Sequence, residues 1–380
     1  MNSFLFVMVA VFLSLVSCKG EDNAGTAMQN DKESALQYAD CLQLTEHPEG
    51  WWEANVVNPW DSTTFLERLA IVPKTLDISM LELPEAMTVV RTPLEKSLVA
   101  STVHIGLIEE FGGENAIAGV MDEDYIKSDK ILERLKNGEI ISCGSWMSPD
   151  IEKVIKLSPD AILLSPYQNG GTYGNITELG IPIIYVADYM EKIPLGRAEW
   201  LKFYGLLYGK EKESEEIFKN VETRYNSLKE LCHENASKNG KKQILMDIPY
   251  SGIWQVPADG STNDIFIKEA GATNPFSNVI GDQFAKLNPE KVLYDAGDAD
   301  VWIIRQNSPG GLSLNQLKKD CTFATQFKAF KDGNVWACNT NESLYFEETP
   351  FHPERIMEDL YHILHDSDSP DTLNYFRRLK

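Results

Sequence analysis

The feature of this sequence that most constrains its fold is an internal repeat on either side of a helical middle. Residues 150–165 and residues 289–305 both run from an Asp or Pro helix start, through Glu-Lys-Val, to Asp and an apolar segment. Glu290 lies 138 residues after its counterpart Glu152. An amphipathic helix that leads into a short buried strand is the unit of a parallel α/β sheet. Two such units predict two similar lobes with a ligand cleft between them.

Length and composition agree with this interpretation. A chain of 380 residues fits two domains better than one, and a hydrophobic content of 43% is ample for ordinary cores. The net charge of −22 makes nucleic acid and anionic lipid unfavourable partners, because both carry negative charge. We interpret the acidity chiefly as a solubility feature.

The N-terminus has the pattern of an export signal. Residues 1–17 contain no charged residue, and Phe4–Val16 is an apolar run too short to span a bilayer. Leu15-Val16-Ser17-Cys18 then resembles the lipobox of bacterial lipoproteins, although no Lys or Arg precedes the apolar run. We predict a signal peptide at 1–17, lipid attachment at Cys18 and a lipid-anchored tether at 18–35. An ordinary signal peptide with a chance Cys is the alternative.

The other five cysteines do not form a metal or redox motif. No two of them are spaced Cys-x-x-Cys, so neither a zinc ribbon nor a thioredoxin-type site is indicated. Cys321 and Cys338 are the pair most favoured for a bridge because they are close in sequence. Buried, unpaired cysteines are an equally good interpretation.

Strands and helices alternate over most of the chain, which predicts doubly wound lobes. A helical segment with apolar residues at helical spacing covers Glu211–Asn235, and at about 37 Å it is long enough to brace two lobes. The expected fold class is therefore α/β: two Rossmann-like lobes joined by a long rigid helix, with a small β-rich N-terminal extension. The predicted divisions are an extension packed on the first lobe at 36–92, an N-terminal lobe at 93–192, interlobe helices at 193–240, a C-terminal lobe at 241–366 and a tail at 367–380.

Motifs for catalysis are missing from the sequence. There is no phosphate-binding Gly-x-x-x-x-Gly-Lys-Ser/Thr loop, no Gly-x-Gly-x-x-Gly after a strand and no Gly-x-Ser-x-Gly elbow. The six histidines are scattered, and His104 is best interpreted as a structural residue near a helix start. We therefore expect no catalytic residue, no bound metal, no cofactor and no enzymatic activity.

Aromatic and amide residues follow the predicted strands in both halves of the chain. Ligands of open α/β sheets bind outside the carboxyl ends of the strands. Flat apolar rings with a few polar groups suit a bulky, partly aromatic ligand. The aromatic residues at these positions are Tyr125, Trp146 and Tyr167 in the first half, and Tyr250, Trp254 and Tyr345 in the second.

Several stretches, in this order, resemble the bacterial substrate-binding proteins that deliver iron–siderophore, haem or vitamin B12 to ABC importers. The resemblance covers about residues 93–365 and leaves 36–92 outside the common pattern. Its pieces are Pro93–Thr102 with the segment to Val120, Gly144–Asp160, Leu179–Pro182, Pro194–Trp200, Phe330–Trp336 and Pro353–Leu360.

The resemblance implies two lobes on a rigid helical link, a shallow cleft lined by aromatics and Arg, and an acidic residue on each lobe that docks on the permease. For docking, only Glu347 or Glu348 is offered, in the second lobe. Arg197 suits an anionic ligand group or an ion pair at a helix start. We expect Trp254 and Tyr167 to sandwich a planar ligand. The cleft candidates are Tyr125, Trp146, Tyr167, Trp254, Arg305 and Tyr345.

The predicted function is capture of a metal chelate by a monomeric, lipid-anchored protein that faces the periplasm or the cell surface and feeds an ABC importer. A ferric siderophore comes first, because it is the commonest ligand of such proteins, followed by cobalamin and then haem. A second interpretation is a surface-exposed capture lipoprotein that serves an outer-membrane receptor, since Glu21-Asp22 after Cys18 resembles a surface-export tag. A two-lobe enzyme is the third.

Overall fold

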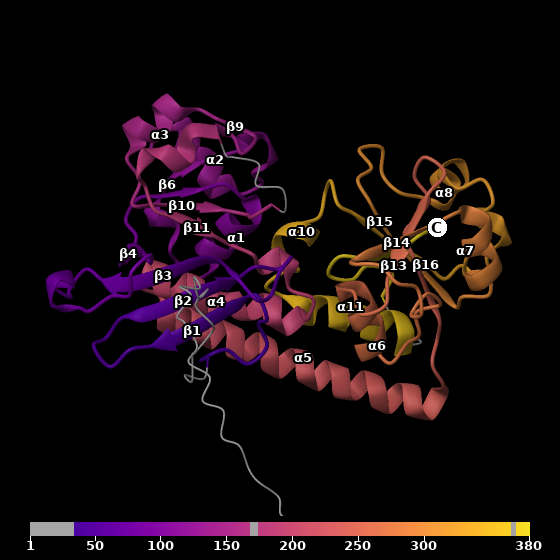
Figure 1. The fold of residues 1–380 in the computed structure, drawn as a ribbon. Helices are drawn as coiled ribbons and strands as arrows, with labels where there is room; N and C mark the ends of the chain where they lie inside the picture. Colours follow the sequence, from indigo (N-terminus) through magenta and orange to yellow (C-terminus); the bar gives the residue numbers. More distant parts are fainter. Residues whose placement is uncertain (1–33, 168–173, 366–369) are drawn as a thin grey trace, which may run out of the picture. The chain divides into compact units, whose positions relative to one another are not determined.

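The computed structural model describes residues 34–167, 174–365 and 370–380 (Figure 1). The predicted signal peptide, Cys18 and nearly all of the tether lie outside the described residues. Within them the chain is mixed α/β, with one all-parallel sheet and one sheet that is parallel except for an edge strand, which confirms the predicted fold class. No helix in the described ranges is both long and apolar enough to cross a membrane.

The first elements of the described residues form a four-stranded sheet in the order β1-β2-β3-β4. The first three strands are antiparallel neighbours, and β4 lies parallel to β3. Glu67 of this sheet accepts a hydrogen bond from the Tyr185 backbone N–H at 3.0 Å, which ties the sheet to the first lobe. The strands are β1 (Leu42–Glu46), β2 (Trp52–Val57), β3 (Phe65–Pro73) and β4 (Thr88–Thr92).

The first lobe contains an all-parallel sheet in the order β11-β10-β5-β6-β7. Strand β10, in the interior of the sheet, is apolar and fully buried, as expected where helices cover both faces of a parallel sheet. The strands are β5 (Ser97–Val99), β6 (Ile117–Val120), β7 (Ile141–Ser142), β10 (Ala161–Leu164) and β11 (Ile183–Tyr185), with a small β8–β9 hairpin (Gly144–Ser145 and Ser148–Pro149). The helices are α1 (Thr102–Glu110), α2 (Asp129–Lys136) and α3 (Ile151–Leu157).

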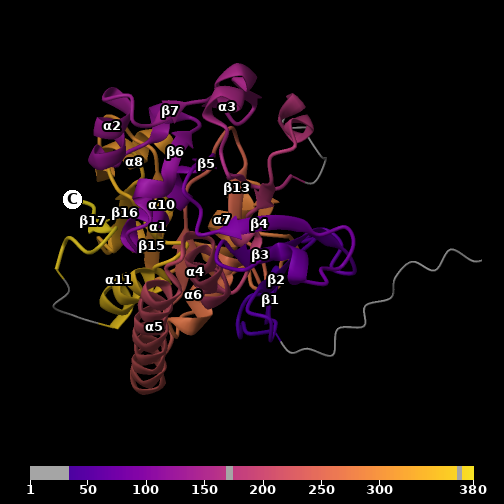
Figure 2. The same cartoon turned by 90° about the vertical axis from the view of Figure 1, so that its left-hand side faces the viewer.

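Two successive helices join the lobes, α4 (Pro194–Tyr208) and α5 (Glu211–Asn239). Pro194 starts α4, and Gly209 ends it with φ +63, a conformation that glycine adopts without strain. With 29 residues, α5 is about 43 Å long and is drawn as one continuous helix in Figures 1 and 2. It is amphipathic: Phe218, Tyr225 and Leu228 are among its buried residues.

The second lobe contains a sheet in the order β12-β15-β16-β17, in which only β17 is antiparallel. A separate antiparallel pair, β13–β14, is inserted after β12. The strands are β12 (Ile244–Met246), β13 (Trp254–Pro257), β14 (Phe284–Leu287), β15 (Val301–Gln306), β16 (Val335–Asn339) and β17 (Arg377–Arg378). The helices are α6 (Thr262–Glu269), α7 (Pro289–Ala296), α8 (Leu314–Asp320), α9 (Lys328–Lys331), α10 (Tyr345–Glu348) and α11 (Pro353–His365).

The repeat in the sequence corresponds to a repeat in the structure. Helix α3 precedes β10, and α7 precedes β15. The N-cap side chains of Asp150 and Asn288 each accept a hydrogen bond from the backbone of a lysine three residues later. Glu152 and Glu290 therefore occupy the same position in the first turn of their helices. Pro149 lies in β9, and Asp150 is the N-cap of α3.

One continuous hydrophobic core runs through the N-terminal sheet, α4, α5 and one side of both lobes. Trp200, Phe203 and Tyr204 of α4 are fully buried in it, and the Tyr204 ring packs edge-on against Phe351 at 6.0 Å. Because α4 packs against both lobes, rotation of one lobe relative to the other would disturb close-packed side chains.

Candidate functional site

Three predicted aromatic residues come together at the carboxyl ends of the first-lobe strands. Tyr125, Trp146 and Tyr167 line one cavity of about 460 Å³. Tyr125 is 71% exposed and Tyr167 is 40% exposed, so both rings are accessible. The remaining lining residues are Ala100, Ser101, Thr102, Asp122, Ser145, Met147, Leu164 and Ser165.

Trp146 and Tyr167 form a stacked pair within this cavity. Their ring centroids are 4.8 Å apart with an interplanar angle of 22°. Asp122 accepts a hydrogen bond from the Trp146 backbone N–H at 3.2 Å, which fixes the hairpin tip that carries the indole. Burial and the nearby Asp122 carboxylate raise the pKa of Tyr167 above its usual value, so its phenol stays protonated. The pair offers a flat surface for a planar ligand.

The β8–β9 hairpin that carries Trp146 depends on Gly144. Its φ is +82, and a Cβ atom at this position would lie 2.9 Å from the Ser148 carbonyl oxygen and 3.1 Å from the Asp150 nitrogen. A side chain would therefore force the tip open. The motif Cys143-Gly-Ser-Trp-Met thus folds as a tight turn that places Ser145, Trp146 and Met147 on the cavity wall.

Two predicted residues of the second lobe, Arg305 and Tyr345, line a different cavity of about 230 Å³. Arg305 forms a two-pronged ion pair with Asp247, and its Nη1 donates to Asn263 Oδ1 at 3.0 Å. Its guanidinium lies 6.0 Å from the Tyr345 ring centroid, and Tyr345 is only 6% exposed. These contacts occupy Arg305 within the protein, where it forms part of the cavity wall.

The structure corrects the prediction for Trp254, whose exposed fraction is 0%. Its indole N–H donates to the Met246 carbonyl oxygen at 2.9 Å. Its ring packs in the second-lobe core against Trp302 at 5.9 Å and Phe327 at 5.7 Å. Trp254 begins β13, and the pairing of β13 with β14 holds its side chain inside. The expected sandwich of a ligand between Trp254 and Tyr167 is therefore wrong.

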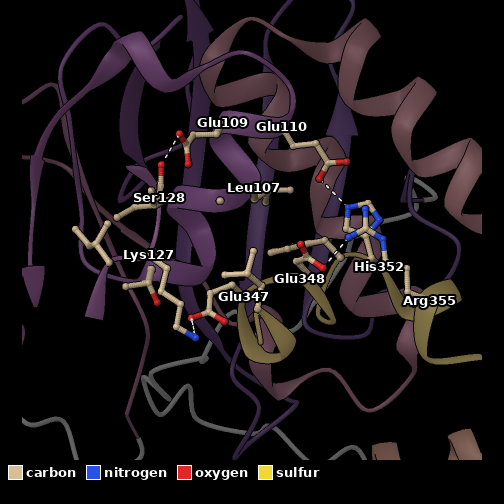
Figure 3. A pocket seen from close by; sticks show the side chains of 15 residues that line it. Leu107, Glu109, Glu110, Lys127, Ser128, Glu347, Glu348, His352 and Arg355 are labelled. Carbon is tan, nitrogen blue, oxygen red and sulfur yellow. Dashed lines mark hydrogen bonds and ion pairs between the residues drawn. The ribbon is translucent and has the colours of Figure 1, made fainter. Parts of the chain in front are cut away.

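Glu347 and Glu348, the residues offered for permease docking, lie in a third cavity of about 430 Å³ between α1 and the region of α10 and α11 (Figure 3). Glu347 forms an ion pair with Lys127 of the first lobe at 3.1 Å. Glu348 accepts from Arg355 at 2.7 Å and from the Tyr375 hydroxyl at 2.9 Å. Both carboxylates are thus engaged inside the molecule, which argues against the predicted docking role.

The same cavity holds two contacts that join the lobes. Lys127 also donates to the Ser343 carbonyl oxygen at 2.9 Å. His352 Nε2 lies 2.7 Å from Glu110 Oε2, and its Nδ1 lies 2.9 Å from Glu354 Oε1. Burial alone would lower the pKa of His352, but the hydrogen bonds to Glu110 and Glu354 outweigh it and raise the pKa to about 9. At neutral pH this histidine is a cation that links α1 to the start of α11.

The remaining site predictions have plain outcomes. His104 is buried and lies 3.0 Å from Asp188, as expected for a structural histidine. Cys321 and Cys338 are buried free thiols, as are the other three described cysteines. In the described ranges, no group of three or more His, Cys, Asp or Glu could hold a metal ion. Sequence reasoning missed two lining residues, Asp122 and Met147. Asp122 lies just after the end of β6 and Met147 follows Trp146, so their positions could have indicated them.

Comparison with known proteins gives a consistent result. Residues 100–341 match the family model described as periplasmic binding protein. A lipoprotein of Methanocaldococcus jannaschii is 29% identical over 355 residues, which cover 87% of this chain and 81% of the relative. The petrobactin-binding protein of Bacillus subtilis is 24% identical over 250 residues, 63% of this chain and 73% of the relative. Among solved structures, a periplasmic haem-binding protein of Pseudomonas aeruginosa has a TM-score of 0.57 at 14% identity and matches 76% of this chain and 98% of its own.

Proposed function

This chain belongs to the periplasmic binding protein family, and from that premise we propose that it captures a metal chelate, a ferric siderophore first, and delivers it to an ABC importer. The family consists of extracytoplasmic substrate-binding proteins for small molecules, not enzymes, and it works with ABC transporters. The ligand and the importer of this chain belong to the proposal. The stacked Trp146–Tyr167 pair in an accessible cavity is the observation that carries it.

The chemistry of the first-lobe cavity supports a bulky ligand with flat rings. Its volume of about 460 Å³ is in the range of small-molecule sites, and aromatic walls with a few polar groups are typical of them. A catecholate siderophore offers rings that can stack on Trp146. The petrobactin-binding relative supports this order of candidates, and the structural likeness to a haem-binding protein keeps haem as an alternative beside cobalamin.

The absorption spectrum of the protein purified from its source tests the proposal. Ferric catecholates, corrinoids and haem absorb at different wavelengths, so a copurified ligand identifies its own class. Titration of the ligand-free protein with a ferric catecholate, haem and cyanocobalamin then ranks the three. Failure of all three to bind at micromolar concentrations would contradict the proposal.

Membrane attachment through Cys18 is the second part of the proposal, supported by the lipobox-like Leu-Val-Ser-Cys and by relatives that are lipoproteins. Cys18→Ser should leave a folded protein that no longer partitions into membranes or detergent. Unchanged retention would place the anchor elsewhere. Protease treatment of whole cells separates a protein facing the periplasm from a surface-exposed capture lipoprotein, because only the latter is cleaved.

Permease docking is better assigned to Glu152 and Glu290 than to Glu347 and Glu348. Both are exposed, both sit at the second position of a capped helix, and neither forms an ion pair with another described residue. Their equivalence in the two lobes fits a partner that offers one cation to each. Charge-removing substitution of both should lower the ATPase stimulation of the importer while ligand affinity stays unchanged. Glu133→Gln, on the first-lobe helix α2, is the matched surface control, and an equal loss in it would contradict the assignment.

A further inference from the structure

The aromatic cavity of the first lobe differs in charge from the other two cavities described above. Asp122 is the one charged side chain among the described residues that line its volume of about 460 Å³. The cavities of about 430 Å³ and 230 Å³ are lined by cationic side chains, among them Lys127 and Arg305. An anionic group in a cavity with aromatic walls attracts cations and repels anions. This cavity should therefore have the opposite charge preference to its neighbours.

Hydrogen bonds on three sides fix Asp122 in place. Its φ is +52, in the left-handed region that Asp and Asn tolerate better than most other residues. Its backbone N–H donates to the Gly144 carbonyl oxygen at 2.9 Å, and its carbonyl oxygen accepts from the Tyr125 N–H at 3.0 Å. Its Oδ2 accepts from the Trp146 backbone N–H at 3.2 Å. Asp122 thus ties together the two segments that carry Tyr125 and Trp146, and its carboxylate has a defined position beside them.

The charge of this carboxylate is not balanced within the described part of the chain. Asp122 forms no ion pair there, and the donor to its carboxylate is the uncharged Trp146 N–H. Lys127, five residues later, forms an ion pair with Glu347 instead. Asp122 is half-buried, so water screens its charge only in part. A cationic group on a ligand would supply the charge partner that the protein does not.

The aromatic rings beside Asp122 strengthen this preference. Trp146 and Tyr167 are stacked with centroids 4.8 Å apart, and the exposed ring of Tyr125 lines the same cavity. The face of an aromatic ring attracts a cation, and the indole of tryptophan does so most strongly. Burial and, after it, the Asp122 carboxylate raise the pKa of Tyr167, so the negative charge lies near that ring as well as near Trp146. A carboxylate among ring faces is a combination suited to organic ammonium groups.

We infer that Asp122 and the rings of Trp146 and Tyr167 form a subsite for an organic ammonium group, so that this protein selects metal chelates that carry a protonated amine. The inference rests on the proposed function, because it takes the first-lobe cavity as part of the chelate site. It allows catecholate or hydroxamate groups on the metal, and it disfavours haem, whose propionates are anionic. The net charge of −22 acts in the same direction, since it attracts cations and repels anions.

The test compares ferric chelates that share one iron-binding core and differ in one terminal group. The ferric complex of desferrioxamine B ends in a protonated primary amine. Acetylation of this amine makes the end neutral, and succinylation replaces its charge by that of a carboxylate. Isothermal titration measures the affinity of the full-length protein in detergent for all three forms, and for an amine-free ferric catecholate, haem and cyanocobalamin.

The variants remove one negative charge at two neighbouring positions. In Asp122→Asn, the asparagine can still accept from the Trp146 N–H and tolerates the left-handed backbone, so the substitution removes the charge alone. Asp124→Asn is the matched control, because Asp124 is exposed, lies two residues away and does not line the cavity. Melting curves on the same samples show whether each variant is folded like the wild-type protein.

We expect the wild-type protein to bind the amine form about 10-fold more tightly than the acetylated form, and the succinylated form more weakly than either. Asp122→Asn should lose most of this preference at an unchanged melting temperature, and Asp124→Asn should keep it. Equal affinity of the wild-type protein for the amine and acetylated forms would overturn the inference and leave the proposed function standing. An unchanged preference in Asp122→Asn, or an equal loss in Asp124→Asn, would do the same.

The other chelates separate the inference from the proposed function. If the amine-free ferric catecholate, haem or cyanocobalamin binds and none of the three desferrioxamine forms does, selection does not depend on the amine. That result would overturn the inference alone. Binding of none of the six chelates at micromolar concentrations would overturn both the inference and the proposed function.

Discussion

The two lobes use the same sequence unit but differ in what they present at their strand ends. In the first lobe, the turn after β8 places Trp146 beside Tyr167 on an accessible wall. In the second lobe, the first strand is followed by the β13–β14 pair, and its tryptophan is buried in the core. The second lobe instead contributes Arg305 and Tyr345. Arg305 forms an ion pair with Asp247, and its guanidinium lies over the Tyr345 ring. The accessible aromatic rings thus lie in the first lobe, and the charged and polar side chains around Arg305 lie in the second.

This difference shows that position after a strand does not determine exposure. Trp146 lies in the two-residue turn between β8 and β9, where it stacks on Tyr167 and stays only partly buried. Trp254 lies in a paired strand, whose alternate side chains face the core. Substitutions in the two tryptophans should therefore change different properties of the protein.

The largest expected effect is on stability, in Trp254→Ala. Removal of a fully buried indole leaves a cavity beside Trp302 and Phe327, and should lower the free energy of unfolding by about 3–5 kcal/mol. Denaturant unfolding measures this loss. Tyr250→Ala, in the same loop region at 84% exposure, is the control and should change little. If Trp254→Ala keeps the wild-type free energy of unfolding but no longer binds the ligand, Trp254 belongs to the site and not to the core. That result would contradict the difference described between the lobes.

The next effect concerns the contact between the lobes and depends on pH. His352 has a folded pKa of about 9, against 6.5 for an unperturbed histidine, so its contribution is complete below pH 6.5 and is lost as pH rises through 9. The shift corresponds to roughly 3 kcal/mol. His352→Gln should lower stability by this amount at pH 6 and converge with wild type near pH 10. If the free energies of unfolding of the two proteins differ by the same amount at every pH from 6 to 10, the Glu110–His352 contact is excluded.

Trp146→Ala should weaken ligand binding by about 1–3 kcal/mol, the range of an aromatic anchor in a pocket. Its melting temperature should change less than that of Trp254→Ala, because Trp146 is only partly buried whereas Trp254 is fully buried. Isothermal titration with the best ligand, together with a melting curve on the same sample, separates the two effects. Trp60→Ala, in the N-terminal sheet region, should leave affinity intact; a matching loss there would point to a global cause.

The smallest expected effect is that of Tyr125→Ala. Its ring is 71% exposed at the rim of the cavity, so a ligand buries only part of it. We expect binding to weaken by about 0.5–1 kcal/mol with no measurable change in stability. Tyr294→Ala, an exposed tyrosine on α7, serves as the comparison. A loss larger than that in Trp146→Ala would move the centre of the site to the rim.

Much of the fold could be predicted because periodic apolar patterns and helix caps are local. The repeat around Glu152 and Glu290, the strand at 161–164 and the long helix from Glu211 all occur as the sequence indicates. The helix extends four residues further, to Asn239, since Gly240 rather than Asn235 ends it. The hairpin β13–β14 was missed because its two strands are 26 residues apart and pairing over that distance has no local signal.

The site could be predicted only in part, for the same reason. The three first-lobe aromatics lie next to local turns, and the structure brings all three together. The partners of Glu347 and Arg197 are distant in sequence or are backbone carbonyls, which carry no side-chain signature. Only the structure could show that Arg197 donates hydrogen bonds to backbone carbonyl oxygens, and that it forms no ion pair with a described residue.

The central claim, that a ligand stacks on the first-lobe aromatics, is tested most directly by intrinsic fluorescence during titration with the ferric catecholate. Wild-type protein should be quenched as the ligand binds, because an absorbing metal complex lies against Trp146. Trp146→Phe keeps a stacking ring, so it should bind with similar affinity but lose most of the quenching. If Trp146→Phe shows saturable binding by calorimetry and is quenched as strongly as the wild-type protein, the ligand lies elsewhere. That result would contradict the account.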